Sequence, residues 1–166
     1  AKAYDVMDGE AKGTGLNIHA AETIRDVTKA AIPLWVARWG GQAVVKTPYS
    51  NAGQGVFTIT NDAELKAFMA TVGHYDRYIV QSLIGNYAWS SDTNTGRFYH
   101  VGTIPNKNGK THVCDLRMMV SSTPKGIRPL ACYSRRAREP LADRLTGTED
   151  SWAMLGTNLS YTSPLY

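Results

Sequence analysis

Residues 43–59, AVVKTPYSNAGQGVFTI, contain two short apolar runs that flank a segment of turn-forming residues. Since β-branched and aromatic residues favour strands, Ala43–Lys46 and Val56–Ile59 are predicted strands. The residues between them include Pro, Ser, Asn and Gly, which are typical of turns. The stretch therefore predicts a β-hairpin with an unusually long tip.

The same hairpin is a candidate phosphate-binding element. Lys46 ends the first strand, and a loop of mostly small residues follows: Ser50, Asn51, Ala52, Gly53, Gln54 and Gly55. Such a loop leaves backbone N–H groups free to point at a phosphate, and the lysine supplies a positive charge. It is not a Walker loop, because the Gly-Lys-Ser/Thr order is missing and the loop joins two strands. The alternative is an ordinary hairpin loop with an exposed lysine.

The flanking sequence predicts helices and a buried strand. Apolar residues at three- or four-residue spacing predict a helix over His19–Ala30 that ends at Pro33. Asn61 or Thr60 can cap a second helix over residues 62–71, in which Glu64 supplies a capping-box acid and the buried face comprises Leu65, Phe68, Met69 and Val72.

The segment Arg77–Leu83 is predicted to be a buried strand. As the chain leaves such a strand, backbone groups of Gln81, Ser82 and Leu83 can pair with the edge of an adenine, and aliphatic neighbours can sandwich the ring. A plain core strand is the alternative interpretation.

The second half of the chain is predicted to be an antiparallel meander. Residues 86–96 favour an exposed connection, and strands are expected around 97–104, 111–120 and 127–138, with a turn at Thr123–Gly126. The order of elements predicts an α+β fold with three parts: a poorly ordered lead-in over 1–18, a helix, hairpin and hinge strand over 19–84, and an antiparallel sheet over 85–166.

Charged residues alternate along the predicted strand at 114–120. Alternation places Asp115, Arg117 and Met119 on one face and Cys114, Leu116, Met118 and Val120 on the other. If the chain turns at 123–126, Arg135 or Arg136 brings a second guanidinium beside Arg117, and two converging cations favour an anionic ligand. A salt bridge on the same face is the alternative.

Composition excludes several classes of protein. The 166 residues are 43% apolar and 19% charged, which excludes a disordered chain, and no run approaches the length of a membrane span. Cys114 and Cys132 cannot form a secreted disulfide framework, and no signal-peptide run precedes them, so we expect reduced thiols and a cytoplasmic location. The pI near 9.1 and the cluster at 135–138 allow a basic nucleic-acid-binding domain, but no nucleic-acid motif accompanies them.

The order of these signals resembles the ATP-grasp superfamily, which includes carboxylate-amine and carboxylate-thiol ligases. The resemblance covers about residues 19–138 and rests on Val45-Lys46, the Gly-rich hairpin, Ile79-Val80-Gln81, Asp115–Val120 and Arg135 or Arg136. It implies an ATP-grasp fold in which a small lid with the Gly-rich hairpin accompanies an antiparallel sheet. It also implies that ATP phosphorylates a carboxylate and that an amine or similar nucleophile attacks the acyl phosphate.

The resemblance assigns roles to individual residues. Lys46 would contact the ATP phosphates, residues 50–55 would cover the β- and γ-phosphates, and 81–83 would be the adenine hinge. Asp115 and Arg117 would face the phosphates and the acyl substrate, and Arg135 or Arg136 would neutralise the transferred phosphate. The implied ligands are ATP, Mg²⁺ and a small-molecule or peptide carboxylate, and neighbouring domains or a partner subunit would complete the substrate site.

The sequence departs from the family pattern at the adenine hinge and at the metal-binding strands, among other places. Ser82 stands where the family usually carries an acid, and the family's magnesium-binding acid and Glu-x-Asn pair are not found, so no metal ligand is assigned and residues 85–166 are expected to be an incomplete sheet subdomain. A non-catalytic nucleotide- or anion-binding module is therefore the main alternative function.

Overall fold

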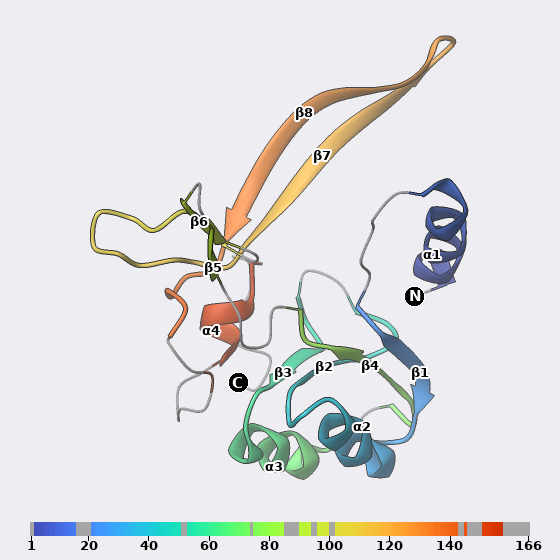
Figure 1. Cartoon of the computed structure of the whole chain (residues 1–166). Helices are drawn as coiled ribbons and strands as arrows, with labels where there is room; N and C mark the ends of the chain where they lie inside the picture. The colour runs from blue at the N-terminus through green and yellow to red at the C-terminus, as the bar shows by residue number, and fades with distance from the viewer. Residues whose placement is uncertain are drawn as a thin grey trace. The chain divides into compact units, whose positions relative to one another are not determined.

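The computed structural model describes residues 2–15, 21–50, 53–73, 75–84, 90–93, 96–99, 102–142, 145 and 151–157. These residues form an α+β protein with antiparallel sheets and few helices, as predicted (Figure 1). They divide into two compact units, one of residues up to 50 and from 55 to 84, the other of 53–54 and the residues after 84. Within the described ranges, no helix is long and apolar enough to cross a membrane.

The first unit is built on a four-stranded antiparallel sheet. Its strands are β1 (Thr23–Val27), β2 (Ala43–Lys46), β3 (Val56–Ile59) and β4 (Tyr78–Ser82), in the order β1-β4-β2-β3. Strands β2 and β3 pair from Ala43 opposite Ile59 to Lys46 opposite Val56. The hairpin predicted from residues 43–59 is therefore confirmed.

Helices α2 (Ile32–Arg38) and α3 (Asp62–Ala70) cover one face of this sheet (Figure 1). The ring of Phe68 on α3 packs edge-on against Phe57 and Tyr78, with centroids 4.9 and 5.6 Å away. Buried apolar side chains from every strand and both helices complete a single core: Val27, Ile32, Val36, Ala43, Val45, Ile59, Phe68, Tyr78 and Val80.

The helix predicted over residues 19–30 is wrong, because residues 23–27 form β1. Ile24 pairs with Val80 but Val27 pairs with Tyr78, so β1 contains one extra residue and a bulge. Asp26 lies in this bulge with a φ of 55°. Because of the bulge, Ile24 and Val27 both face the core although they are three positions apart in the sequence. The same spacing is typical of one face of a helix. Pro33 begins α2 instead of ending a helix, since proline is tolerated in the first turn.

Helix α3 begins as predicted. Asn61 is its N-cap, and its side-chain oxygen accepts a hydrogen bond from the backbone N–H of Glu64 at 2.9 Å. The Glu64 carboxylate in turn accepts from the backbone N–H of Thr60 at 2.8 Å. The predicted burial of Val72 is wrong: the helix ends at Ala70, and Val72 is 85% exposed.

The lead-in and the second unit also differ from prediction. Residues Lys2–Thr14, expected to be poorly ordered, form helix α1. Residues Ser90–Thr93, expected in an exposed connection, form β5 and pair with β6 (Gly96–Tyr99). Strands β7 (Cys114–Thr123) and β8 (Gly126–Arg136) form a separate ribbon, so the described strands make two hairpins instead of one meander.

A small core lies at the base of the ribbon. Its buried residues are His112, Ala137, Leu145, Ser151, Trp152 and Met154, the last three from α4 (Ser151–Leu155). Backbone hydrogen bonds tie the segments together, from Ala137 N–H to Val113 and from Glu139 N–H to Ala153. The side chain of His112 lies 3.2 Å from the carbonyl of Ala137. These contacts fix the ends of β7 and β8 that adjoin the small core.

Candidate functional site

The sheet of the first unit has a second face, opposite α2 and α3, where several predicted site residues lie. Partners in an antiparallel register share a face. The pairing therefore places Gln81 beside Val44 in one row of this face, and Ile79 beside Lys46 in the next. An aliphatic strip formed by Val44 and Ile79 thus adjoins a lysine. This arrangement suits a flat apolar ring attached to an anionic group.

Lys46 is the most informative residue of this face. It is half-buried at the end of β2, and burial lowers the pKa of its ammonium group. No hydrogen bond or ion pair to Lys46 is found within the described residues. A charge that loses water without gaining a partner costs free energy. An anion bound at Lys46 Nζ would offset this cost.

The glycine-rich loop begins beside Lys46. The N–H of Thr47 donates to the carbonyl of Gly55 at 2.8 Å, which closes the base of the loop. Gly53 and Gly55 have φ angles of 85° and 67°, a region that other residues rarely adopt. A Cβ at Gly55 would lie 2.1 Å from Thr47 Oγ1. Both glycines are therefore required by the backbone, whereas the predicted site residues Asn51 and Ala52 lie outside the described residues.

The predicted adenine hinge is fastened to β1. Gln81 Nε2 donates to Thr23 Oγ1 at 2.6 Å. Ser82 donates its backbone N–H to the carbonyl of Glu22 at 2.9 Å, and its hydroxyl accepts from the N–H of Glu22 at 3.0 Å. Ser82 thus serves as a structural link at the position where the resemblance implies an acid. Leu83, directly after β4, is half-buried.

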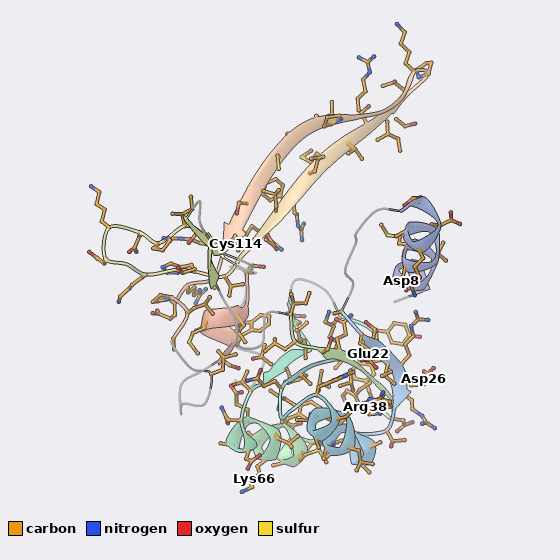
Figure 2. All side chains as sticks on the ribbon, in the orientation of Figure 1. Asp8, Glu22, Asp26, Arg38, Lys66 and Cys114 are labelled. Carbon is orange, nitrogen blue, oxygen red and sulfur yellow. The ribbon has the colours of Figure 1, made fainter. Side chains whose placement is uncertain are left out.

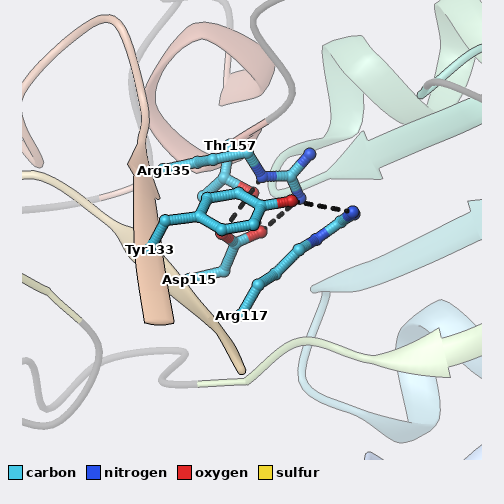
Figure 3. Close-up of polar contacts among 5 residues, drawn as sticks. All are labelled: Asp115, Arg117, Tyr133, Arg135 and Thr157. Atoms are coloured by element: carbon cyan, nitrogen blue, oxygen red, sulfur yellow. Dashed lines mark hydrogen bonds and ion pairs between the residues drawn. The ribbon is translucent and has the colours of Figure 1, made fainter. Parts of the chain in front are cut away.

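In the second unit, two side chains, those of Arg135 and Thr157, donate hydrogen bonds to the Asp115 carboxylate (Figure 3). Arg135, its partner across the ribbon, donates from Nε to Oδ1 at 3.2 Å and from a terminal nitrogen to Oδ2. Thr157 donates its hydroxyl to Oδ2 at 2.8 Å. The Arg135 hydrogen bond is the main reason why the pKa of Asp115 lies below its ordinary value. Two predicted site residues therefore neutralise each other.

Arg117 lies on the same face of the ribbon but is exposed and has no carboxylate partner among the described residues. Its guanidinium donates a long hydrogen bond of 3.5 Å to the hydroxyl of Tyr133, the residue opposite it. Figure 3 shows Arg117, Tyr133 and Arg135 projecting in the same direction from the ribbon. Arg136 pairs with Cys114 and therefore lies on the opposite face.

The structure thus brings the predicted residues together in two groups, one in each unit. Lys46 and Gln81 share the second face of the sheet, and Asp115, Arg117 and Arg135 share one face of the ribbon. Tyr133 and Thr157 were missed by the sequence analysis. The alternation of β8 could have identified Tyr133, whereas no sequence signal links Thr157 to Asp115. Both cysteines are free, as expected.

The chain matches no protein-family model, and no curated protein or solved structure shows a significant similarity to it.

Proposed function

We propose that the chain binds ATP on the face of the first unit's sheet that carries Lys46 and Gln81, as part of an ATP-grasp-like ligase. In this arrangement Val44 and Ile79 contact the adenine, the backbone beyond β4 pairs with the edge of the ring, and Lys46 binds the phosphates. The loop of residues 50–55 covers the β- and γ-phosphates. The order of strands and helices from β1 to β4 supports the proposal, because it sets Lys46 and the hinge on neighbouring strands.

The observation that carries the proposal is the half-buried Lys46, which has no hydrogen bond or ion pair among the described residues. An exposed surface lysine would be solvated and would need no ligand, whereas Lys46 loses hydration and gains no partner from the part of the chain that the structure describes. The two positive-φ glycines add support, because they shape the adjoining loop without bulky side chains.

The proposed reaction is activation of a carboxylate. A carboxylate oxygen attacks the γ-phosphorus of ATP, ADP leaves, and the acyl phosphate forms. An amine or similar nucleophile then attacks the acyl carbon and displaces phosphate. Within the ribbon, Arg117 is better suited than Arg135 to bind an anion, because Asp115 already neutralises Arg135.

The described residues do not fit the magnesium ion that the family resemblance implies. No group of three or more His, Cys, Asp or Glu that could hold a metal is found among them. Asp115, the carboxylate that the resemblance places near the phosphates, is engaged by Arg135 and Thr157. No step of the proposal is therefore assigned to a metal held by these residues.

Thermal unfolding tests nucleotide binding, and hydroxylamine tests catalysis. Millimolar ATP should raise the unfolding midpoint more than the same concentration of adenosine, because the phosphates supply the contact to Lys46. With ATP, Mg²⁺ and a panel of carboxylates, hydroxylamine should trap the acyl phosphate as a hydroxamate. An unchanged midpoint with ATP contradicts nucleotide binding.

Nucleotide binding without catalysis is the second candidate function. The ion pair between Asp115 and Arg135 favours it, because each charge is satisfied within the ribbon and is not held ready for a substrate. Under this function ATP still raises the midpoint, but no hydroxamate forms with any carboxylate of the panel.

A further inference from the structure

The ribbon of β7 and β8 is amphipathic, and the described residues of the second unit leave its apolar face largely exposed. The register sets Leu116 opposite Ser134, Met118 opposite Cys132, Val120 opposite Pro129 and Ser122 opposite Ile127. These residues share one face, whereas Asp115, Arg117, Tyr133 and Arg135 share the other. Leu116, Met118 and Ile127 are 72%, 60% and 74% exposed. Large apolar side chains in one contiguous row are rarely left to water.

The length and the ends of this face indicate what could cover it. From Cys114 to Ser122 an extended strand spans roughly 27 Å, which is the length of a helix of about 18 residues. A cation stands at each end: Arg136 beside Cys114 at the base, and Lys125 in the turn at the tip. Sheet faces are commonly covered by helices with an apolar stripe.

Charge argues against a second copy of the chain as the cover. When two such faces pack together, Arg136 and Lys125 of one copy meet the same cations of the other. The ribbon from 114 to 136 contains Arg117, Lys125, Arg128, Arg135 and Arg136 but only one carboxylate, Asp115, so its other side offers no compensation. A partner that packs on the apolar face must therefore place carboxylates near Arg136 at the base of the ribbon and near Lys125 at its tip.

We propose that this apolar face binds an amphipathic helix of another polypeptide, with carboxylates near both ends of its apolar stripe. The stripe packs on Leu116, Met118, Val120 and Ile127, and the carboxylates lie near Arg136 and Lys125. This contact is independent of nucleotide binding, because it uses the face of the ribbon opposite Arg117.

The test uses the full chain and two synthetic helical peptides of about 18 residues. Both carry the same leucine stripe, but one has glutamates at both ends and the other has lysines. Fluorescence anisotropy should show that the glutamate peptide binds at least about tenfold more tightly than the lysine peptide. Lys125→Glu should reduce the ratio between the affinities of the two peptides, because it removes one of the two cations. Equal affinity for the two peptides, or no binding of either, would overturn the proposal.

Adjacent methionines on opposite faces provide matched variants. Met118→Ser should weaken binding of the glutamate peptide about tenfold, because it removes apolar area from the contact. Met119→Ser lies on the face that carries Arg117 and should change the affinity for the glutamate peptide by less than about twofold. Equal losses in the two variants contradict the assigned face. Light scattering should show a monomer, and a dimer that Met118→Ser dissociates would mean that a second copy is the occupant.

Discussion

Asp115 and Arg135 face each other across the β7–β8 ribbon, and Arg135 donates to both oxygens of the Asp115 carboxylate. Thr157 adds a third hydrogen bond from beyond α4. The acid and one of the predicted cations therefore form a structural pair, whereas Arg117 has no carboxylate partner among the described residues. This relationship changes the roles expected from sequence and leads to a measurable pH dependence.

Arg135 lowers the pKa of Asp115 below its ordinary value of about 3.9, so the charged form favours the folded state. The contribution is complete above the unfolded-state pKa and is lost as the pH falls through the folded-state pKa. We expect Asp115→Asn to lower the free energy of unfolding by about 0.5–1 kcal/mol at pH 7. In urea titrations the difference from the unsubstituted protein should shrink below about pH 4. A difference that persists unchanged in acid would mean that the ion pair is not its cause.

The bulge of β1 requires a residue that tolerates a positive φ. Asp26 has a φ of 55°, and β-branched residues adopt this region only with strain. Asp26→Val should therefore destabilise the protein by about 1–2 kcal/mol, whereas Asp26→Gly should cost little. Urea unfolding of the two variants measures the difference. Equal stability would argue against the bulge and would reopen the helical interpretation of this segment.

Two glycines separate backbone strain from steric clash. Gly55 and Gly109 have φ angles of 67° and 72°, but only Gly55 has a neighbour within reach of an added Cβ, at Thr47 Oγ1. Gly109→Ala should cost about 1 kcal/mol from strain alone. Gly55→Ala should cost clearly more and should also weaken ATP binding, because it displaces the loop next to Lys46. Equal losses in the free energy of unfolding for the two variants would show that an added Cβ at Gly55 does not clash with Thr47.

The cap of α3 should contribute a measurable part of the stability of the first unit. Asn61 and Glu64 satisfy backbone N–H groups at the start of the helix. Asn61→Ala should cost about 1 kcal/mol in urea unfolding, and Asp62→Ala, one residue further on, should cost less. The opposite ranking would contradict the assignment of Asn61 as the N-cap.

Local patterns predicted much of the first unit and the faces of the ribbon. The β2–β3 hairpin and α3 follow from turn residues and a capping box, and the alternation at 114–120 correctly separates Asp115 and Arg117 from Leu116 and Met118. The β1 segment could not be predicted in this way, because a bulge at Asp26 gives a strand the apolar spacing of a helix.

The candidate site was harder to predict than the fold. The sequence places Lys46 at the end of a strand, but its partial burial depends on packing by residues distant in the chain. With a turn at 123–126, the sequence allowed Arg135 either to join Arg117 in binding an anion or to form a salt bridge with Asp115. The register of β7 and β8 sets Arg135 opposite Asp115 and so favours the salt bridge. The hydrogen bond from Thr157 joins residues far apart in sequence and has no local signal.

Calorimetric titration of two lysine variants measures whether Lys46 binds the phosphates of ATP. Lys66 on α3 is exposed and points away from the sheet (Figure 2), so Lys66→Met is the matched control for Lys46→Met. The loss of one charged contact should weaken ATP binding roughly ten- to hundred-fold in Lys46→Met and leave Lys66→Met like the unsubstituted protein. Adenosine, which lacks phosphates, should bind all three proteins alike. Equal ATP affinities for the two variants, or no binding of ATP to the unsubstituted chain at millimolar concentration, would contradict the account.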